Sequence, residues 1–346
     1  FTEIRGRKVS VGTLYTKKNH APSDQAKADL DALREVLPHQ LAVVDVEANP
    51  ELNAVYNGLV PIVQIGPYRL QSPFTIQDLQ VALGAARDRS EHLNRIGDVQ
   101  HEQRVERGHK FSGTDRFSLW LSRWYMFVIT AFLVLYIGLP FLAPILQRAG
   151  ATGPAKVIYT IYSPLCHQLP YRSWFLYGSQ PFYPRELAEI EGVASYEEFV
   201  GAKPGLSLAA ERKFTGTELG YGAEPVGYKV ALCQRDVAIY ASMAVFALIF
   251  IVSGRRIKPL PWYLWLVLGL VPIGIDGFSQ LPSLIQQLPD WLIMRESTPV
   301  LRTVTGSLFG IATSWYLFPM IEDSMRETRK MLAGKKAIVS QIQKEP

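Results

Sequence analysis

The sequence predicts a small α/β domain followed by an α-helical membrane domain with four transmembrane helices and an extracytoplasmic cap. Three observations predict this class. The early residues alternate apolar patterns typical of strands and helices, four later runs lack charged residues, and basic residues cluster beside those runs. We expect four parts in chain order: an α/β domain over 1–87, a charged linker and interfacial segment over 88–118, the membrane domain over 119–322, and a basic tail over 323–346.

The composition favours a membrane protein over an ordinary cytosolic enzyme. Of the 346 residues, 48% are hydrophobic and 19% are charged, and the mean hydropathy is +0.06. Soluble domains carry about 25% charged residues. The apolar content also excludes intrinsic disorder. The two cysteines exclude a disulfide-rich secreted scaffold and a zinc finger built from cysteines alone.

The first part of the chain has the element order βαβαββα. Alternating or continuous apolar residues predict the strands, and apolar residues at helical spacing predict the helices. Ser23 or Asp24 is a suitable N-cap for the first helix. The expected elements are strand 8–15, helix 23–36, strand 41–46, helix 50–56, strand 60–65, strand 68–70 and helix 75–86.

Four short motifs of this domain resemble glutaredoxin- or thioredoxin-like domains: Leu14-Tyr15-Thr16-Lys17, Val44-Asp45, Asn49-Pro50-Glu51-Leu52 and Val60-Pro61-Ile62-Val63. The resemblance implies a cis Pro61 bordering a substrate groove, and it places the two family cysteines at His20 and Ser23. Disulfide exchange needs a thiolate, which neither side chain supplies. This degenerate redox site therefore predicts a redox-inactive docking module.

The four uncharged runs are Trp124–Gln147, Val237–Gly254, Pro259–Ile275 and Thr303–Ile321. A helix of about 20 residues crosses the roughly 30 Å of hydrocarbon in a bilayer. Basic residues precede the first run, join the second to the third and follow the fourth, as in Arg123, Arg255 and Arg329. By the positive-inside rule, we expect a multi-pass protein of the cytoplasmic (inner) membrane with both termini in the cytoplasm.

With this topology, residues 148–236 and 281–298 lie outside the membrane. The longer segment is polar and contains many prolines and glycines. We expect a folded cap; a disordered loop is the alternative. Near the first span, Phe117, Leu119 and Trp120 are expected to lie along the lipid headgroups.

Several separated motifs resemble a family of predicted prokaryotic membrane proteins catalogued as a domain of unknown function. They are Cys166-His167-Gln168, Arg172-Ser173-Trp174, Cys233-Gln234-Arg235-Asp236, Asp276-Gly277, Arg295-Glu296-Ser297 and Thr305-Gly306. The resemblance covers residues 125–321 and is interrupted by an extra segment near 179–226. It implies a shared fold and brings no established activity.

Three kinds of chemistry stay open for Cys166 and Cys233, which the topology places outside. A structural disulfide is favoured in an oxidising compartment and requires Cα atoms within about 7 Å. A zinc or copper site would use Cys166, His167, Cys233 and Asp236, although we expect no cofactor as the default. The third alternative is a pair that exchanges thiols and disulfides.

A second polar group gathers near the outer ends of the last two spans: Asp276, Gln280, Arg235, Arg295 and Arg302. An ionised side chain at membrane depth needs a partner or a wet cavity. We expect Asp276 to pair with Arg302 or Arg295, either as a clamp between spans or in a polar pocket or proton path. Small residues over 303–314 suit close packing of helices, either within the chain or against a helix of a partner.

Together these features favour a non-catalytic accessory, scaffold or assembly subunit of a larger membrane complex, such as an electron-transfer complex. Its partners would be the lipid bilayer and other membrane subunits, with no nucleic acid. The alternative is an outer-face thiol or metal-binding protein, or a small transporter, that uses Cys166, His167, Cys233 and Asp276.

Overall fold

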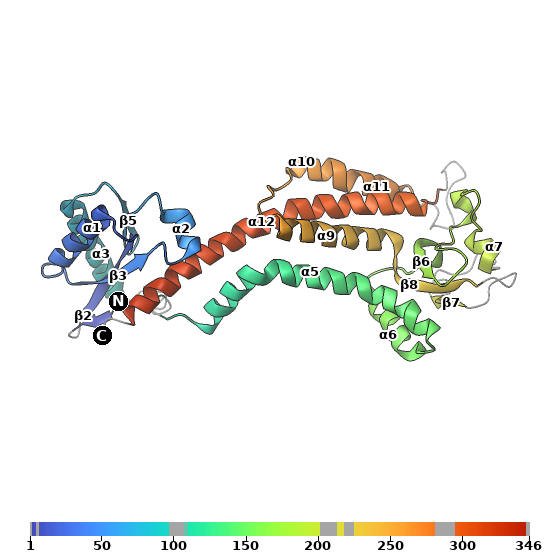
Figure 1. Cartoon of the computed structure of the whole chain (residues 1–346), viewed down its shortest axis with the longest axis horizontal. Helices are drawn as coiled ribbons and strands as arrows, with labels where there is room; N and C mark the ends of the chain where they lie inside the picture. The colour runs from blue at the N-terminus through green and yellow to red at the C-terminus, as the bar shows by residue number, and fades with distance from the viewer. Residues whose placement is uncertain are drawn as a thin grey trace. The chain divides into compact units, whose positions relative to one another are not determined.

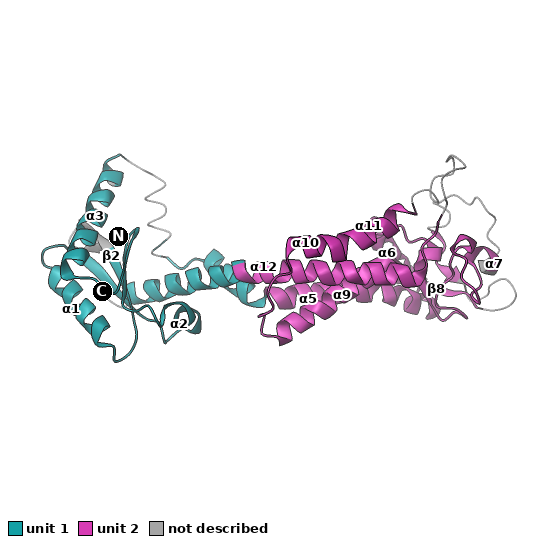
Figure 2. Ribbon diagram, turned by 90° about the horizontal axis from the view of Figure 1, so that it is seen from above, with its two compact units in different colours: residues 1–124, 324–346 teal, residues 125–323 magenta. Residues whose placement is uncertain are grey.

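A computed structural model describes residues 2–4, 7–96, 108, 110–200, 213–217, 225–280 and 295–343 of the chain. The chain divides into two compact units (Figure 2). Unit 1 combines Phe1–Trp124 with Ser324–Pro346, and unit 2 is Tyr125–Asp323.

Unit 1 contains a mixed sheet of five strands: β1 (Thr2–Ile4), β2 (Arg7–Thr16), β3 (His39–Asp45), β4 (Ile62–Ile65) and β5 (Tyr68–Gln71). Strand β2 pairs in parallel with β3 and antiparallel with β4, and β4 pairs antiparallel with β5. The expected order βαβαββα is confirmed. Strand β1, which pairs antiparallel with β2, was not predicted.

Helices α1 (Ala21–Leu33) and α3 (Ile76–Arg95) cover one face of this sheet. Their apolar residues recur at helical spacing, as predicted, and pack onto the inward side chains of β2, β3 and β4. The buried set is Leu14, Ala26, Leu30, Leu33, Leu41, Val63, Ile65, Leu79, Ala82, Leu83 and Ala86. Helix α3 is longer than predicted, since it continues past residue 86 through a charged stretch to Arg95.

The other face of the sheet carries helix α2 (Pro50–Tyr56) and the C-terminal part of helix α12 (Pro299–Ile342). Ala333 is buried against Tyr15, Val44, Val46, Leu52, Val60 and Ile62, with Ala337 and Ile338 beside it. Side chains as small as alanine let the helix approach the sheet closely. The residues expected to form a basic tail are therefore helical up to Ile342, and part of them contributes to the core of unit 1.

Unit 2 contains parts of three helices that are long and apolar enough to cross a membrane: α5 (Gly113–Arg148), α9 (Gln234–Val252) and α12. Figure 1 and Figure 2 show α9 and α12 side by side in this unit. Three of the four expected spans thus correspond to long helices.

The remaining uncharged run forms a shorter helical segment, Trp262–Phe278, so the structure does not confirm it as a fourth span. This segment consists of α10 (Trp262–Trp265), a π-helical turn (Leu266–Leu270) and α11 (Val271–Phe278). Pro272 is the second residue of α11, just after the wide turn. Because proline has no N–H and its ring crowds the carbonyl four residues earlier, it disrupts regular α-helical bonding at this place.

Between α5 and α9, the described residues form a folded segment. It contains α6 (Thr152–Tyr162), β6 (Ser173–Leu176), α7 (Tyr196–Val200), β7 (Gly216–Thr217) and β8 (Gly227–Cys233), with short 3-10 turns at Pro170–Arg172 and Glu186–Ala188. The strands form a three-stranded sheet in the order β6-β8-β7. Six buried residues form its core: Leu169, Tyr171, Phe175, Tyr183, Tyr196 and Val226. The sheet and core of the described residues favour a folded cap over a disordered loop.

Candidate functional site

A small pocket in unit 2 gathers most of the residues that the sequence singled out. Its volume is about 240 Å³. It is lined by residues that follow α6, by the 3-10 turn at Pro170–Arg172, by the start of α9, by a residue just after α11 and by the start of α12. The lining residues are Leu165, Cys166, His167, Gln168, Leu169, Arg172, Cys233, Arg235, Asp236, Gln280 and Arg302. We call this the cysteine pocket.

The two cysteines meet in this pocket although they are far apart in the sequence. Both are free thiols. The Cys166 sulfur, the Cys233 sulfur and an Asp236 carboxylate oxygen all lie within 4.8 Å of one another. The Cys233 thiol donates a hydrogen bond to Asp236 Oδ2 at 3.0 Å. The structure therefore brings the pair together without the disulfide that was one expectation.

Local structure holds each thiol in place. Cys233 is the N-cap residue of α9, which sets Asp236 in the first turn of the same helix. Cys166 follows the end of α6, and its sulfur accepts the Gln168 backbone N–H at 3.4 Å. The Gln168 carbonyl oxygen in turn accepts a bond from the buried Lys229 ammonium at 2.6 Å. The side-chain amide of Gln168 donates a hydrogen bond to the Tyr159 carbonyl at 2.9 Å, so the turn that carries Cys166 is fixed from two sides.

The surroundings of Cys233 favour its protonated form. The hydrogen bond with Cys166, the burial of the thiol and the negative charge of Asp236 all raise the pKa of Cys233 well above its ordinary value. Cys233 is therefore held as a thiol.

The expected metal set is only partly assembled. Cys166, Cys233 and Asp236 form the close group, whereas His167 lines the same pocket without belonging to that group. The side chain of His167 is exposed.

Asp276 pairs with Arg235 and Arg295 and not with Arg302. Its carboxylate forms a close ion pair with Arg235 and lies 3.7 Å from the Arg295 guanidinium. Thr305 donates its hydroxyl to the same carboxylate at 3.4 Å. Of the two expected partners of Asp276, the described contacts include Arg295, whereas Arg302 binds another acid.

That acid is Glu296, whose side chain is 1% exposed. It accepts two hydrogen bonds from Arg172, at 2.9 Å from Nε and 3.0 Å from Nη2. It also forms a close ion pair with Arg302. Glu296 belongs to the motif Arg295-Glu296-Ser297, but it was not predicted to join the polar cluster. The available signal was an acid next to Arg295, shortly before an uncharged run.

Arg302 connects the cap to the last two helical segments. Its guanidinium donates to the Tyr171 carbonyl at 3.2 Å and to the Gln280 side-chain oxygen at 3.3 Å. Gln280 in turn donates to the Asp276 carbonyl at 2.6 Å. The expected cluster of Asp276, Gln280, Arg235, Arg295 and Arg302 is thus assembled, with Arg172 and Glu296 added. Among the contacts described, this arrangement fits a clamp between helices.

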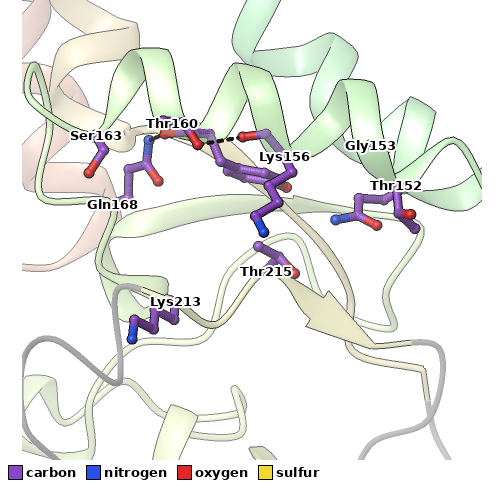
Figure 3. Close-up of a pocket in the computed structure, with 10 residues that line it drawn as sticks. Thr152, Gly153, Lys156, Thr160, Ser163, Gln168, Lys213 and Thr215 are labelled. Carbon is purple, nitrogen blue, oxygen red and sulfur yellow. Dashed lines mark hydrogen bonds between the residues drawn. The ribbon is translucent and has the colours of Figure 1, made fainter.

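A larger pocket of about 910 Å³ lies beside α6 (Figure 3). Lys156 extends from the helix toward Thr215, and Lys213 lies across the cavity (Figure 3). The described lining residues are uncharged or basic: Gln147, Thr152, Gly153, Lys156, Tyr159, Thr160, Ser163, Gln168, Lys213 and Thr215. Burial raises the pKa of Tyr159 well above its ordinary value, so its hydroxyl stays neutral. This pocket was not predicted from the sequence.

In unit 1, the two positions of the degenerate redox site face each other. His20 is the N-cap residue of α1, and its Nδ1 atom lies 2.8 Å from the Ser23 hydroxyl. Ser23 is buried. The Val60–Pro61 peptide bond is cis, as the resemblance implies for Pro61. The N-cap is His20, not the predicted Ser23 or Asp24, because the helix begins two residues earlier.

One protein-family match covers the part of the chain that contains α9, α11 and the first part of α12. Residues 226–316 match a family described as predicted membrane protein (DUF2085). This range includes Cys233, Asp276, Glu296 and Arg302. The chain is also similar to an uncharacterized protein, MJ1492, of the archaeon Methanocaldococcus jannaschii. The two are 26% identical over 208 residues, which cover 58% of this chain and 94% of that protein.

Together, the apolar helices and the family match make this a membrane protein with several candidate spans, similar over part of its length to a family of unknown function. No solved structure matches the chain. The sheet and helices of unit 1 confirm its α/β character, whereas the comparisons do not support its thioredoxin-like assignment.

Proposed function

We propose that this membrane protein is a non-catalytic adaptor subunit whose α/β module is a thiol-free, thioredoxin-like docking domain. The main support for this proposal is the contact between His20 and Ser23 at the start of α1. An imidazole and a hydroxyl occupy the two positions where the resemblance requires thiols. A module that keeps this framework without thiols has lost disulfide exchange and retains a surface for binding.

The chain's own connectivity supports four crossings with both termini on the cytoplasmic side. Unit 1 contains residues before the first span and residues after the last one. Since these segments pack into a single unit, they belong on the same side of a membrane, which requires an even number of crossings. Trp262–Phe278 supplies the fourth, because a helix of about 17 residues is at the lower limit for spanning.

Isolation in a mild detergent tests the adaptor role. The native particle should have a mass above the 38.8 kDa of the chain and contain a second membrane subunit in a fixed ratio. Lys18→Glu, next to the start of α1, should weaken that association by about tenfold through loss of about 1.4 kcal/mol. Lys27→Glu, on the exposed face of α1, is the matched control and should leave it unchanged. A particle of this chain alone would contradict the proposal.

Restoring thiols tests the placement of the degenerate site. In a chain carrying Cys166→Ser and Cys233→Ser, the double change His20→Cys and Ser23→Cys should create a pair that oxidises reversibly. The reason is that the side chains at these positions already meet. Labelling with a mass-tagged maleimide before and after oxidation measures it.

The single change His20→Cys is the control, since one thiol has no partner within the chain. If both introduced thiols remain open to maleimide after oxidation, the thioredoxin-like placement is refuted.

A second candidate function is thiol or metal chemistry in the cysteine pocket. What favours it is the convergence of two thiols and a carboxylate beside a cavity that Arg172, Arg235 and Arg302 also line. Such a combination of nucleophilic and cationic groups is typical of binding and reactive sites. Counting thiols before and after mild oxidation of the whole chain tests whether the pair is redox-active.

A further inference from the structure

We propose that Cys166, Cys233 and Asp236 form a binding site for one thiophilic divalent cation, with zinc as the best-suited ion. The inference rests on the second candidate function and is independent of the adaptor role. Its geometric basis is the group of two sulfurs and one carboxylate oxygen within 4.8 Å of one another.

The spacing of these atoms suits a tetrahedral ion. Zinc binds cysteine sulfur at about 2.3 Å and carboxylate oxygen at about 2.0–2.2 Å, so neighbouring ligand atoms lie roughly 3.5 Å apart. Cys233 and Asp236 already approach to 3.0 Å. Small side-chain rotations therefore bring the three atoms around one centre. Two sulfurs with one oxygen also favour zinc over magnesium or calcium, which prefer oxygen ligands alone.

The backbone around the site stabilises anionic ligands. Cys233 caps α9 and Asp236 lies in its first turn, where unpaired N–H groups and the helix dipole favour negative charge. The Gln168 N–H bond to the Cys166 sulfur persists when that sulfur becomes a thiolate. Such outer contacts are a regular feature of metal sites.

Protons and charges balance when the cation binds. Binding of the cation releases the two thiol protons to solvent, which leaves two thiolates, one carboxylate and one dication with a net charge of −1. Around the same pocket, Arg172 and Arg302 share the charge of Glu296, and Arg235 and Arg295 share that of Asp276. The excess positive charge of this cluster offsets the negative charge of the site. Three protein ligands leave one coordination position open toward the cavity, as in zinc sites that bind water or a substrate.

Zinc and cobalt binding by the full chain test the proposal. The protein is purified in detergent, reduced with a phosphine, stripped of metal by a chelator and desalted. We then expect about one zinc bound per chain by elemental analysis. Cys166→Ser and Cys233→Ser should each weaken zinc binding by about 100-fold or more, and Asp236→Asn by about tenfold. Glu198→Gln, an exposed acid elsewhere in the cap, is the control and should not change it.

Cobalt gives a readout that needs no variant. Co²⁺ bound to the wild-type chain should show a thiolate-to-metal absorption band in the near ultraviolet and visible bands of a tetrahedral ion. Two results would overturn the proposal: wild-type protein with two titratable thiols that binds no zinc, or a Cys166→Ser/Cys233→Ser chain that binds zinc as tightly as wild type. If zinc fails to bind while the thiols oxidise reversibly, the metal site is refuted and the thiol function stands.

Discussion

Replacing Glu296 by glutamine is expected to lower the apparent melting temperature of the protein in detergent by on the order of 10 °C. The carboxylate is buried and forms ion pairs with two guanidiniums, those of Arg172 and Arg302. Removing one member of a buried ion cluster leaves the others uncompensated and typically costs about 3–5 kcal/mol. For a unit of this size, each kcal/mol corresponds to roughly 2–4 °C.

The matched control for this change is Glu197→Gln. Glu197 also pairs with an arginine of the cap, Arg185, at 3.2 Å, but both side chains are partly exposed. Solvent screens such a pair, so its loss should cost less than about 1 kcal/mol. Fluorescence-monitored unfolding of both variants in the same detergent gives the comparison. Equal effects of the two changes would mean that the Glu296 cluster is not closed to solvent.

A double substitution separates the ion cluster from simple loss of packing. If the cost of Glu296→Gln comes from uncompensated arginines, adding Arg302→Met should recover part of the lost stability, because one of the stranded charges is removed. Neighbouring residues in one network show coupling of about 0.5–3 kcal/mol in such cycles. Additive losses would indicate that the two residues act separately.

The elements of unit 1 could be predicted because local pattern and final environment agree there. Leu30 on α1 and Val63 on β4 point into the same core that their apolar spacing requires. Strand β1 was missed because a strand of three residues carries too little periodicity to detect. The role of Ala333 was also hidden, since a small apolar residue in a basic segment carries no sign of the sheet it covers.

The sequence predicted which residues would form the cysteine pocket, but not which acid would pair with which arginine around it. Cys166, Cys233 and Asp236 were chosen for their chemistry, and the fold brings them together. Which acid binds which arginine depends on side-chain directions that spacing does not supply. Arg302 turns to Glu296, six residues before it, while Arg235 on α9 takes Asp276. The wide turn before Pro272 was likewise not predicted, because an uncharged run gives no sign of where its helical hydrogen bonding becomes irregular.

The small residues over 303–314 were expected to serve close helix packing, and Gly310 fulfils this within the unit itself. It faces α9, where a Cβ atom at residue 310 would fall on the Ser242 hydroxyl and the Ile239 carbonyl oxygen. At Gly306 the Cβ would lie 2.8 Å from the Arg235 carbonyl oxygen. In lipid, helices associate through such close contacts because no hydrophobic force drives them together.

Gly310→Ala is therefore expected to force α9 and α12 apart and to destabilise unit 2 by about 1–3 kcal/mol or more. The obstacle is backbone on the facing helix, which cannot move aside as a flexible side chain can. The matched control is Gly274→Ala in α11, where nothing lies within 4 Å of the added Cβ. There the change should be neutral or stabilising by up to about 1 kcal/mol, since alanine favours helix over glycine.

Thermal unfolding in detergent, with monodispersity checked by size-exclusion chromatography, measures both glycine variants. Because α9 begins at the Cys233–Asp236 turn, separating it from α12 should also weaken zinc binding in Gly310→Ala and leave it intact in Gly274→Ala. The same melting temperature for the two variants would show that α9 and α12 do not meet at Gly310. The cysteine pocket would then depend on the cap and the Arg302 contacts rather than on the close approach of these two helices.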